Sequence, residues 1–184
     1  HDSNAIRVLS QNFSPDDISD TLLEHDCDVK VLLSLVIDLM STYRERDMIE
    51  FTAMALSSVY GPRQLAGGGV VAAFLAAQQS GMPPCFEGDG RQTRDFVYID
   101  DVVDALVRAG ERGSGLVINI GTGVQTTLRE LWAEVGGGAS SAAAVVASRA
   151  DDLPRFAVSS VRARIHLGWS PWTSLADGLM RIRN

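Results

Sequence analysis

Short apolar runs alternate along this chain with longer segments in which apolar residues recur every three or four positions. The short runs predict strands and the longer segments predict helices. Expected strands are residues 6–9, 29–35, 49–59, 85–87, 95–99, 116–120 and 142–147. Expected helices are a segment that begins at Ser14, a segment that follows residue 35 and reaches Arg46, and residues 70–79, 101–110, 127–135, 160–167 and 174–182. This alternation predicts an α/β fold.

A glycine turn precedes a short strand near the middle of the chain. Gly88 and Gly90 can adopt the positive φ angles that tight turns need. Side chains alternate along the strand, which places Arg94 and Asp95 on opposite faces. Arg94 is therefore expected at the edge of a small sheet, where its guanidinium can meet an anion. The alternative is a surface ion pair between Arg94 and either Asp95 or Asp89.

Three helix ends carry local signals. Asp100 or Asp101 can cap the helix that follows this strand, and both suit its positive N-terminal end. Thr127 and Glu130 have the spacing of a capping box. Gly168 is expected to end a helix, because glycine readily adopts the left-handed conformation found there.

The segment Gly121-Thr122-Gly123 has only part of the pattern of a dinucleotide-binding loop. Such a loop needs a third glycine where Thr126 stands, because its helix must pack close to its strand. It also needs an acidic residue about 20 positions later, where this chain is rich in glycine, serine and alanine. We therefore interpret the segment as a strand end before a capped helix.

The chain has 184 residues, 46% apolar and 21% charged, which is enough for one domain with a core. Its formal net charge of −7 argues against general nucleic-acid binding. No apolar run reaches the ~18 residues needed to span a bilayer, so no membrane segment is expected. Cys27 and Cys85 lack metal-ligand spacing and the histidines are scattered, so no metal is expected. Two free, buried thiols in a cytoplasmic protein are the preferred interpretation, with a disulfide as the alternative.

Four further segments, whose order along the chain is informative, lie before and after the glycine turn. They are Ser58-Val59-Tyr60-Gly61-Pro62-Arg63-Gln64, Asn119-Ile120-Gly121-Thr122-Gly123, Arg149-Ala150-Asp151-Asp152 and Leu167-Gly168-Trp169-Ser170-Pro171. Together with residues 88–102, they resemble the C-terminal half of the extended short-chain dehydrogenase/reductase family. The resemblance is to its NAD-dependent nucleotide-sugar epimerases and dehydratases of the UDP-glucose 4-epimerase type, and it covers residues 36–182.

This resemblance implies a remnant of a Rossmann-type parallel sheet together with the small C-terminal substrate-binding α/β subdomain. Residues 1–64 would form the partial Rossmann-like portion, and residues 65–184 would form the nucleotide-sugar-binding portion. The two portions are expected to interleave in one compact unit.

The resemblance also implies a site for a nucleotide sugar, either a UDP-sugar or a dTDP-sugar. Arginines that match Arg94 and Arg149 clamp the diphosphate in the family, and the aspartate that matches Asp152 lies at the nucleoside. An arginine fork suits phosphate oxygens, and a carboxylate can accept hydrogen bonds from ribose hydroxyls. Phe86 matches a position near the nucleobase, with a core aromatic as the alternative. Ser58 stands where the family usually has a ligand-binding asparagine, and its side chain has a shorter reach.

The catalytic features of the family are not found in this chain. The family binds NAD and uses a tyrosine and a lysine four residues apart on one helix, where the lysine lowers the tyrosine pKa. Alignment of residues 36–43 with that helix places Val29 and Leu33 at these positions, and Lys30 is the only lysine in the chain. No catalytic residue is therefore assigned, and NAD is expected from the family rather than from these residues.

We expect nucleotide-sugar binding as part of an NAD-dependent nucleotide-sugar epimerase or dehydratase. The alternatives are a truncated, spliced or discontinuously recorded family member, a catalytically inactive binding paralogue, and a fragment that folds only with a partner. A cytoplasmic location is expected, and a homodimer is left open.

Overall fold

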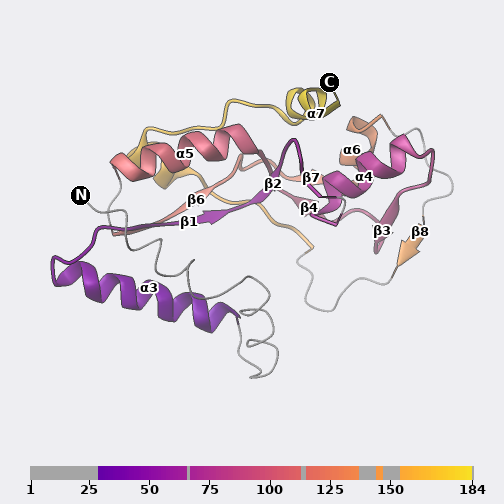
Figure 1. Ribbon diagram of the computed structural model, residues 1–184. Coiled ribbons are helices and arrows are strands. Elements are labelled where there is room, and N and C mark those ends of the chain that lie inside the picture. The colour runs from indigo at the N-terminus through magenta and orange to yellow at the C-terminus, as the bar shows by residue number, and fades with distance from the viewer. Residues whose placement is uncertain (1–28, 66, 113–114, 137–143, 147–153, 184) are drawn as a thin grey trace. The chain divides into compact units, whose positions relative to one another are not determined.

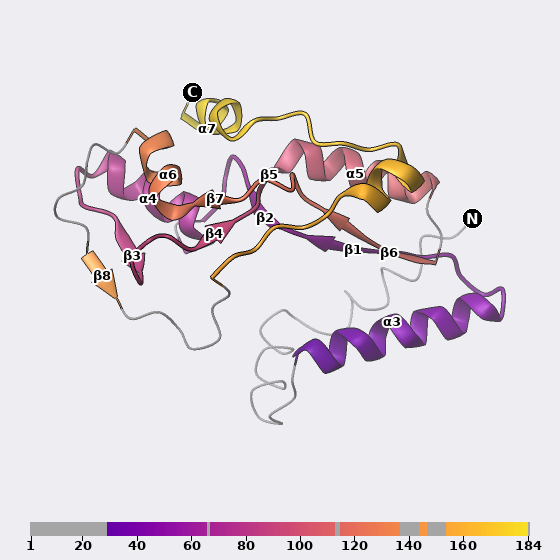
Figure 2. The ribbon, with the colours of Figure 1, turned by 180° about the vertical axis from the view of Figure 1, so that it is seen from behind.

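The computed structural model describes residues 29–65, 67–112, 115–136, 144–146 and 154–183 (Figures 1 and 2). The strand expected at residues 6–9, the helix expected at Ser14, and Cys27, Arg149 and Asp152 lie outside the described residues. Contacts divide the chain into two units. One is His1–Ala53 with Ser114–Leu116, and the other is Met54–Gly113 with Val117–Asn184.

The first unit contains a long helix, α3 (Val29–Glu45). The strand predicted for residues 29–35 is wrong, because these residues form the beginning of α3. A run of apolar residues fits a buried strand or a helix, and its length decides between them. No glycine or proline interrupts the run, so the helix continues for 17 residues. Leu33, Leu35 and Leu39 are each more than half exposed on it.

The second unit contains the other elements. Its strands are β1 (Thr52–Leu56, shared with the first unit), β2 (Ser58–Tyr60), β3 (Cys85–Glu87), β4 (Thr93–Arg94), β5 (Phe96–Tyr98), β6 (Leu116–Ile120, also shared), β7 (Thr126–Thr127) and β8 (Ala144–Val146). Its helices are α4 (Val70–Gln79), α5 (Ile99–Glu111), α6 (Leu128–Glu134), the π-helix η1 (Ala163–Leu167) and α7 (Leu175–Arg183). β1 pairs with β6, β2–β5 and β3–β8 pair in parallel, and β4–β7 pair antiparallel. Helices beside parallel strand pairs confirm the α/β class.

Local patterns predict several of these elements correctly. The helix over residues 70–79 and the strand over residues 116–120 have the predicted bounds. Thr127 and Glu130 form the predicted capping box, and Gly168 follows η1 with a φ of 62°. The strand predicted over residues 49–59 is instead two strands, because the chain changes partner at Ser57. The Ser57 amide donates to Ile120 at 2.9 Å, and the next amide donates to the carbonyl of Asp95, also at 2.9 Å.

The aspartate cap predicted for α5 is wrong. Tyr98 occupies the N-cap position, and no side chain caps the helix there. The helix begins directly after β5, so Asp100 and Asp101 already lie inside its first turn. Both charges still face the positive end of the helix dipole.

Aromatic side chains dominate the core of the second unit. The Phe74 ring lies 5.5 Å from the rings of Phe86 and Trp132, and the Tyr60 ring lies 5.6 Å from that of Tyr98. Their edge-to-face geometries add to the free energy of burying these rings. Burial raises the pKa of Tyr60 well above its ordinary value, and the nearby Asp101 raises it further.

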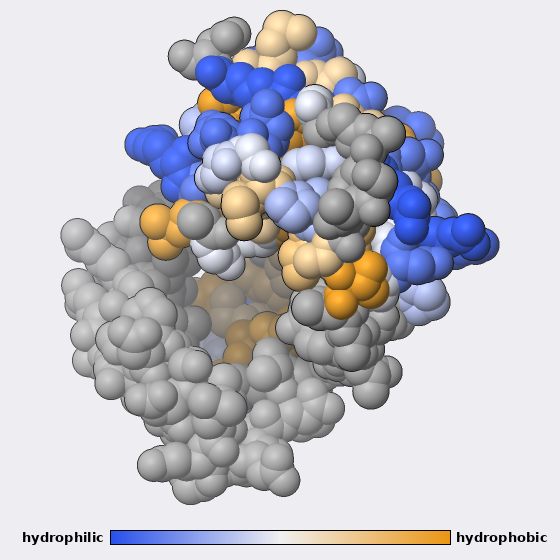
Figure 3. Space-filling model, turned by 90° about the vertical axis from the view of Figure 1, so that its right-hand side faces the viewer, coloured by the Kyte–Doolittle hydropathy of each residue, from blue (hydrophilic) through white to orange (hydrophobic). Residues whose placement is uncertain are grey.

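The surface of the second unit is mixed. Figure 3 shows hydrophilic residues over much of the described part of one side, with hydrophobic patches between them. Cys85 is a free and exposed thiol, so the buried thiol predicted at this position is wrong. Alternation along β3 explains the error, because Phe86 points into the core and its neighbour therefore points outward. Within the described ranges, no helix has the length and apolar character to cross a membrane, and no three potential metal ligands gather.

Candidate functional site

Arg94 lies on β4, a two-residue strand that is held on both sides. β4 pairs with β7, with Thr93 opposite Thr127 and Arg94 opposite Thr126. The guanidinium Nη1 of Arg94 donates to the carbonyl of Thr93 at 2.8 Å, and the side chain is half-buried. Arg94 therefore lies in a small sheet, and its predicted place at an edge where it can meet an anion stays a prediction.

The two carboxylates proposed as surface partners of Arg94 have other partners. Asp89 lies in the glycine turn, where its carboxylate pairs with Arg91 at 3.4 Å and accepts from the Arg91 amide at 3.0 Å. Asp95 is fully buried and accepts hydrogen bonds from a loop and a neighbouring segment. Burial therefore contradicts a surface ion pair between Arg94 and Asp95, and a pair with the exposed Asp89 stays an alternative.

The glycine turn docks the start of α6. Gly90 has a φ of 73°, and a Cβ there would lie 3.1 Å from the Phe86 ring and 3.2 Å from Cγ of Arg129. Its carbonyl accepts from the Arg129 amide at 3.2 Å, while Nε of Arg129 donates to the carbonyl of Asp89 at 2.7 Å. A side chain at this position would be strained by the positive φ and would press against both Phe86 and Arg129.

Phe86 is a core residue with a cation above its ring. It is 4% exposed, and the guanidinium carbon of Arg129 lies 6.0 Å from the ring centre. The core alternative for Phe86 is therefore confirmed, and its contact with a ligand remains a prediction. Both can hold, because the backbone of β3 has only β8 as a strand partner among the described strands.

Asp95 and the segment Gly121-Thr122-Gly123 form one buried anion site. Oδ1 of Asp95 accepts from the amide and hydroxyl of Thr122 at 2.8 and 2.6 Å. Oδ2 accepts from the amides of Gly123 and Val158 at 2.9 and 3.2 Å. The interpretation of this segment as structural rather than cofactor-binding therefore fits its contacts. Its amides already bind an internal carboxylate and are not available to a pyrophosphate.

Ser58 lies on β2 directly beside this anion site. It pairs in parallel with Phe96, and its amide donates to the carbonyl of Asp95 at 2.9 Å. Its neighbour Ser57 is buried, and within the described part of the chain its hydroxyl makes no hydrogen bond. Ser58 is thus fixed by its backbone, and its role toward a ligand remains a prediction.

The two ends of the segment that holds Arg149 and Asp152 are both attached near the glycine turn and β4. Before it, β8 pairs with β3, so that Ala144 lies opposite Cys85. After it, the amide of Thr93 donates to the carbonyl of Pro154 at 3.0 Å, and residue 155 forms a bridge with Thr93. Arg149 and Asp152 themselves lie outside the described residues, but only seven residues separate these two attachments.

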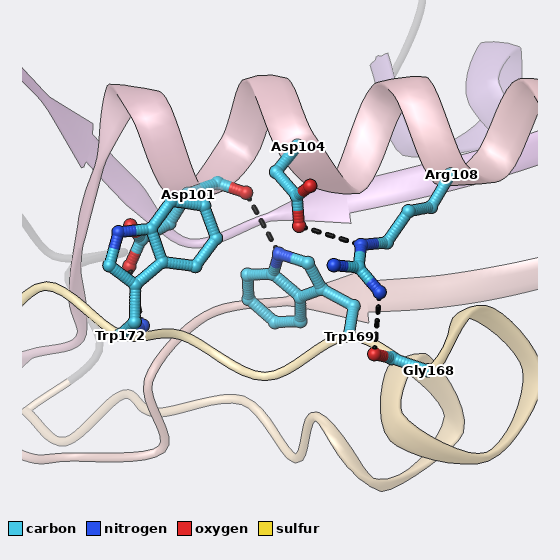
Figure 4. A network of polar contacts seen from close by, with 6 residues as sticks. All are labelled: Asp101, Asp104, Arg108, Gly168, Trp169 and Trp172. Carbon is cyan, nitrogen blue, oxygen red and sulfur yellow. Dashed lines mark hydrogen bonds and ion pairs between the residues drawn. The ribbon is translucent and has the colours of Figure 1, made fainter.

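A second buried carboxylate, Asp101, ties the C-terminal segment to α5 (Figure 4). Its side chain accepts from the amides of Trp172 and Thr173 at 3.1 and 3.0 Å and from the hydroxyl of Thr173 at 2.7 Å. Its carbonyl accepts from Nε1 of Trp169 at 2.8 Å, which confirms the predicted packing role of that tryptophan. Arg108 adds a bond to the carbonyl of Gly168 at 2.8 Å.

Sequence reasoning missed both buried aspartates. It placed Asp95 on the face opposite Arg94, considered it as a surface ion-pair partner, and treated Asp101 as a possible helix cap. Each stands beside an apolar strand, β5, whose residues are all buried. A carboxylate next to such a strand needs several donors, and the glycine-containing segment at residues 121–123 was the available signal for them.

Three comparisons place this architecture among known proteins. Residues 35–121 match the profile described as NAD dependent epimerase/dehydratase family. A UDP-glucose 4-epimerase of Mycolicibacterium smegmatis is 42% identical over 147 residues, which are 77% of this chain and 47% of that protein. The crystal structure of a Thermotoga maritima UDP-glucose 4-epimerase with UDP-glucose is 35% identical, with a TM-score of 0.71 over 77% of this chain and 48% of that one.

A Thermus thermophilus UDP-glucose 4-epimerase, in complex with NAD, is 30% identical, with a TM-score of 0.67 over 79% of this chain and 49% of that one. These similarities confirm the predicted Rossmann-type α/β fold in partial form. The chain spans about half the length of the relatives that it matches.

Proposed function

Since the matched part of this chain belongs to the NAD-dependent epimerase/dehydratase family, among the extended short-chain dehydrogenase/reductases, we propose that the chain provides the nucleotide-sugar clamp of such an enzyme. Arg94 and Arg149 hold the diphosphate, Asp152 contacts the ribose, and Phe86 and Ser58 line the site. UDP is the preferred nucleotide, because the Thermotoga maritima relative was solved with UDP-glucose.

The attachment of residues 154–155 to β4 is the observation that carries this proposal. It brings the chain just after Asp152 against Thr93, the residue before Arg94. The parallel pairing of β3 with β8 holds the chain before Arg149 beside Cys85–Glu87, directly before the glycine turn. Seven residues extend to at most about 25 Å, so Arg149 stays within reach of the diphosphate that Arg94 would bind. Two guanidinium groups then share one dianionic ligand.

Hydride transfer is not part of what we propose for this chain alone. The family uses NAD as its redox cofactor, but the described residues do not fit it. The amides of Thr122 and Gly123 are occupied by Asp95, and α3 has valine and leucine where the aligned family helix has tyrosine and lysine. Purified protein is therefore expected to release no NAD on denaturation, measured by absorbance. Release of stoichiometric NAD would contradict this part of the proposal.

Thermal unfolding with UDP tests the clamp directly. A ligand at 100 times its Kd stabilises the folded state by about 2.7 kcal/mol. For a chain of this size we expect a rise in Tm of roughly 5–10 °C. Arg94→Ala should remove most of the rise, whereas Arg164→Ala, an exposed arginine of η1, should preserve it. A flat Tm for the unmodified chain with UDP, dTDP and UDP-glucose at millimolar concentration would refute the clamp.

The exposed leucines of α3 favour a second candidate, in which the chain functions only within a larger assembly. Leu33 and Leu35 are each 57% exposed, and exposed apolar patches mark contact surfaces. Sedimentation velocity separates the candidates: a monomer that binds UDP supports the binding paralogue, and a stable oligomer supports the assembly. We also propose a cytoplasmic location, supported by the free, exposed thiol of Cys85.

A further inference from the structure

The buried carboxylate of Asp95 lies next in the chain to Arg94, and we propose that Asp95 is a positioning residue of the nucleotide-sugar clamp. This inference rests on the proposed function and concerns the same site. Asp95 itself is 0% exposed, so it does not touch a ligand in the surrounding solvent. It acts through the segments that it holds together.

Those segments are the ones that carry the candidate residues. The carbonyl of Asp95 accepts from the amide of Ser58 on β2. Its carboxylate accepts from the Val158 amide at 3.2 Å, in the segment that follows Asp152. Asp95 is therefore bonded to the strand of Ser58 and to the chain beyond Asp152, and it is covalently joined to Arg94.

The carboxylate is matched to this task by its two acceptor oxygens. Four donors approach them, two from Thr122 and one each from Gly123 and Val158. An asparagine would offer one acceptor oxygen, and its NH₂ group would face amide donors that it cannot satisfy. Of the two oxygens, Oδ2 is the one that holds Val158. Asp95→Asn can keep the bonds at Thr122 while releasing the segment at Val158.

The attachment of residues 154–158 has a second contact that Asp95 supports. The hydroxyl of Thr93 accepts from the amide of Phe156 at 3.3 Å, and Thr93 is buried on β4. Release of Val158 leaves the contacts with Thr93 to hold residues 154–156. A looser attachment of this segment at Thr93 gives β4 more freedom, which misplaces Arg94 in the clamp without altering the arginine itself.

The test is the Kd for UDP of four proteins, measured by calorimetry: the unmodified chain, Asp95→Asn, Arg94→Lys and the double variant. We expect Asp95→Asn to weaken binding roughly tenfold, with less than about a threefold further effect in the Arg94→Lys background, because both act on one clamp. Amide exchange at Phe156 and Val158 should accelerate together with the loss of affinity. Asp104→Asn, which removes a carboxylate paired with Arg108 on α5, should leave the Kd unchanged.

Three results overturn the inference or its premise. An unmodified chain that does not bind UDP refutes the proposed function, and Asp95 then has no clamp to position. If that chain binds UDP and Asp95→Asn binds it equally, Asp95 is structural only. If Asp95→Asn lowers the affinity for UDP by the same factor with and without Arg94→Lys, Asp95 acts outside the clamp. If Asp95→Asn does not fold, Val158→Pro removes the Val158 amide that Asp95 holds, and a Kd unchanged by it overturns the proposal.

Discussion

Asp95 and Asp101 are two buried carboxylates at opposite ends of one strand, and they hold different parts of the molecule. Both are 0% exposed, and both bind chain amides and a threonine hydroxyl. Asp95 precedes β5 and joins the segments that carry the candidate site. Asp101 follows β5 and joins α5 to the C-terminal segment. The chemistry of a buried aspartate therefore does not reveal its role, and the segments that it connects do.

The largest expected effect is that of Asp101→Ala on stability. It removes the acceptors of three donors on Trp172 and Thr173, and each unsatisfied buried donor costs about 1–3 kcal/mol. We expect a loss of roughly 2–3 kcal/mol in the free energy of unfolding, measured in urea. The Kd of the folded protein for UDP should not change. A weakened Kd would erase the distinction between the two aspartates.

Gly121→Ala should disturb the contacts around Asp95. A Cβ at this position would overlap Cγ2 of Val158 and lie 2.7 Å from Oδ2 of Asp95 and 2.8 Å from Oγ of Ser57. Overpacking of this kind costs about 1–3 kcal/mol. We expect both a lower Tm and a weaker Kd for UDP, followed by calorimetry.

Gly168→Ala is the matched control, because Gly168 lies in the C-terminal segment that is tied to α5. Its φ of 62° costs an alanine roughly 1–2 kcal/mol, so that Tm should fall. Affinity for UDP should stay as in the unmodified chain. Equal losses of affinity in the two alanine variants would show that general destabilisation explains both.

Ser57→Ala should have the smallest effect. The Ser57 hydroxyl is buried and makes no hydrogen bond to the described residues, so its removal relieves a desolvation cost. The free energy of unfolding should stay constant or rise by less than about 1 kcal/mol. A fall of more than about 1 kcal/mol in urea would show that this hydroxyl has a partner beside Asp95.

Local signals in the sequence were sufficient for parts of this fold. The spacing of Thr127 and Glu130 fixes one helix start, because a cap depends on nearby residues alone. The apolar run at residues 29–35 misled the prediction, since it suits a helix and a strand alike. No local signal shows which strand pairs with which, and so none showed that the chain changes partner at Ser57.

The candidate site depended on the resemblance to a family rather than on local pattern. Arg94 could be placed at a sheet edge from its own segment, but Arg149 and Asp152 are distant in the chain and gain meaning only from matching motifs. Asp95 escaped notice because its donors come from residues 122, 123 and 158, and contacts over such separations are fixed by packing.

The outward thiol of Cys85 gives access to the site by spectroscopy. The chain has two cysteines, so Cys27→Ser leaves Cys85 as the single point for a maleimide fluorophore. The dye would sit on β3, one residue from Phe86 and on the strand that pairs with β8. Its emission would then follow UDP titration in real time, at a position that leaves both arginines untouched.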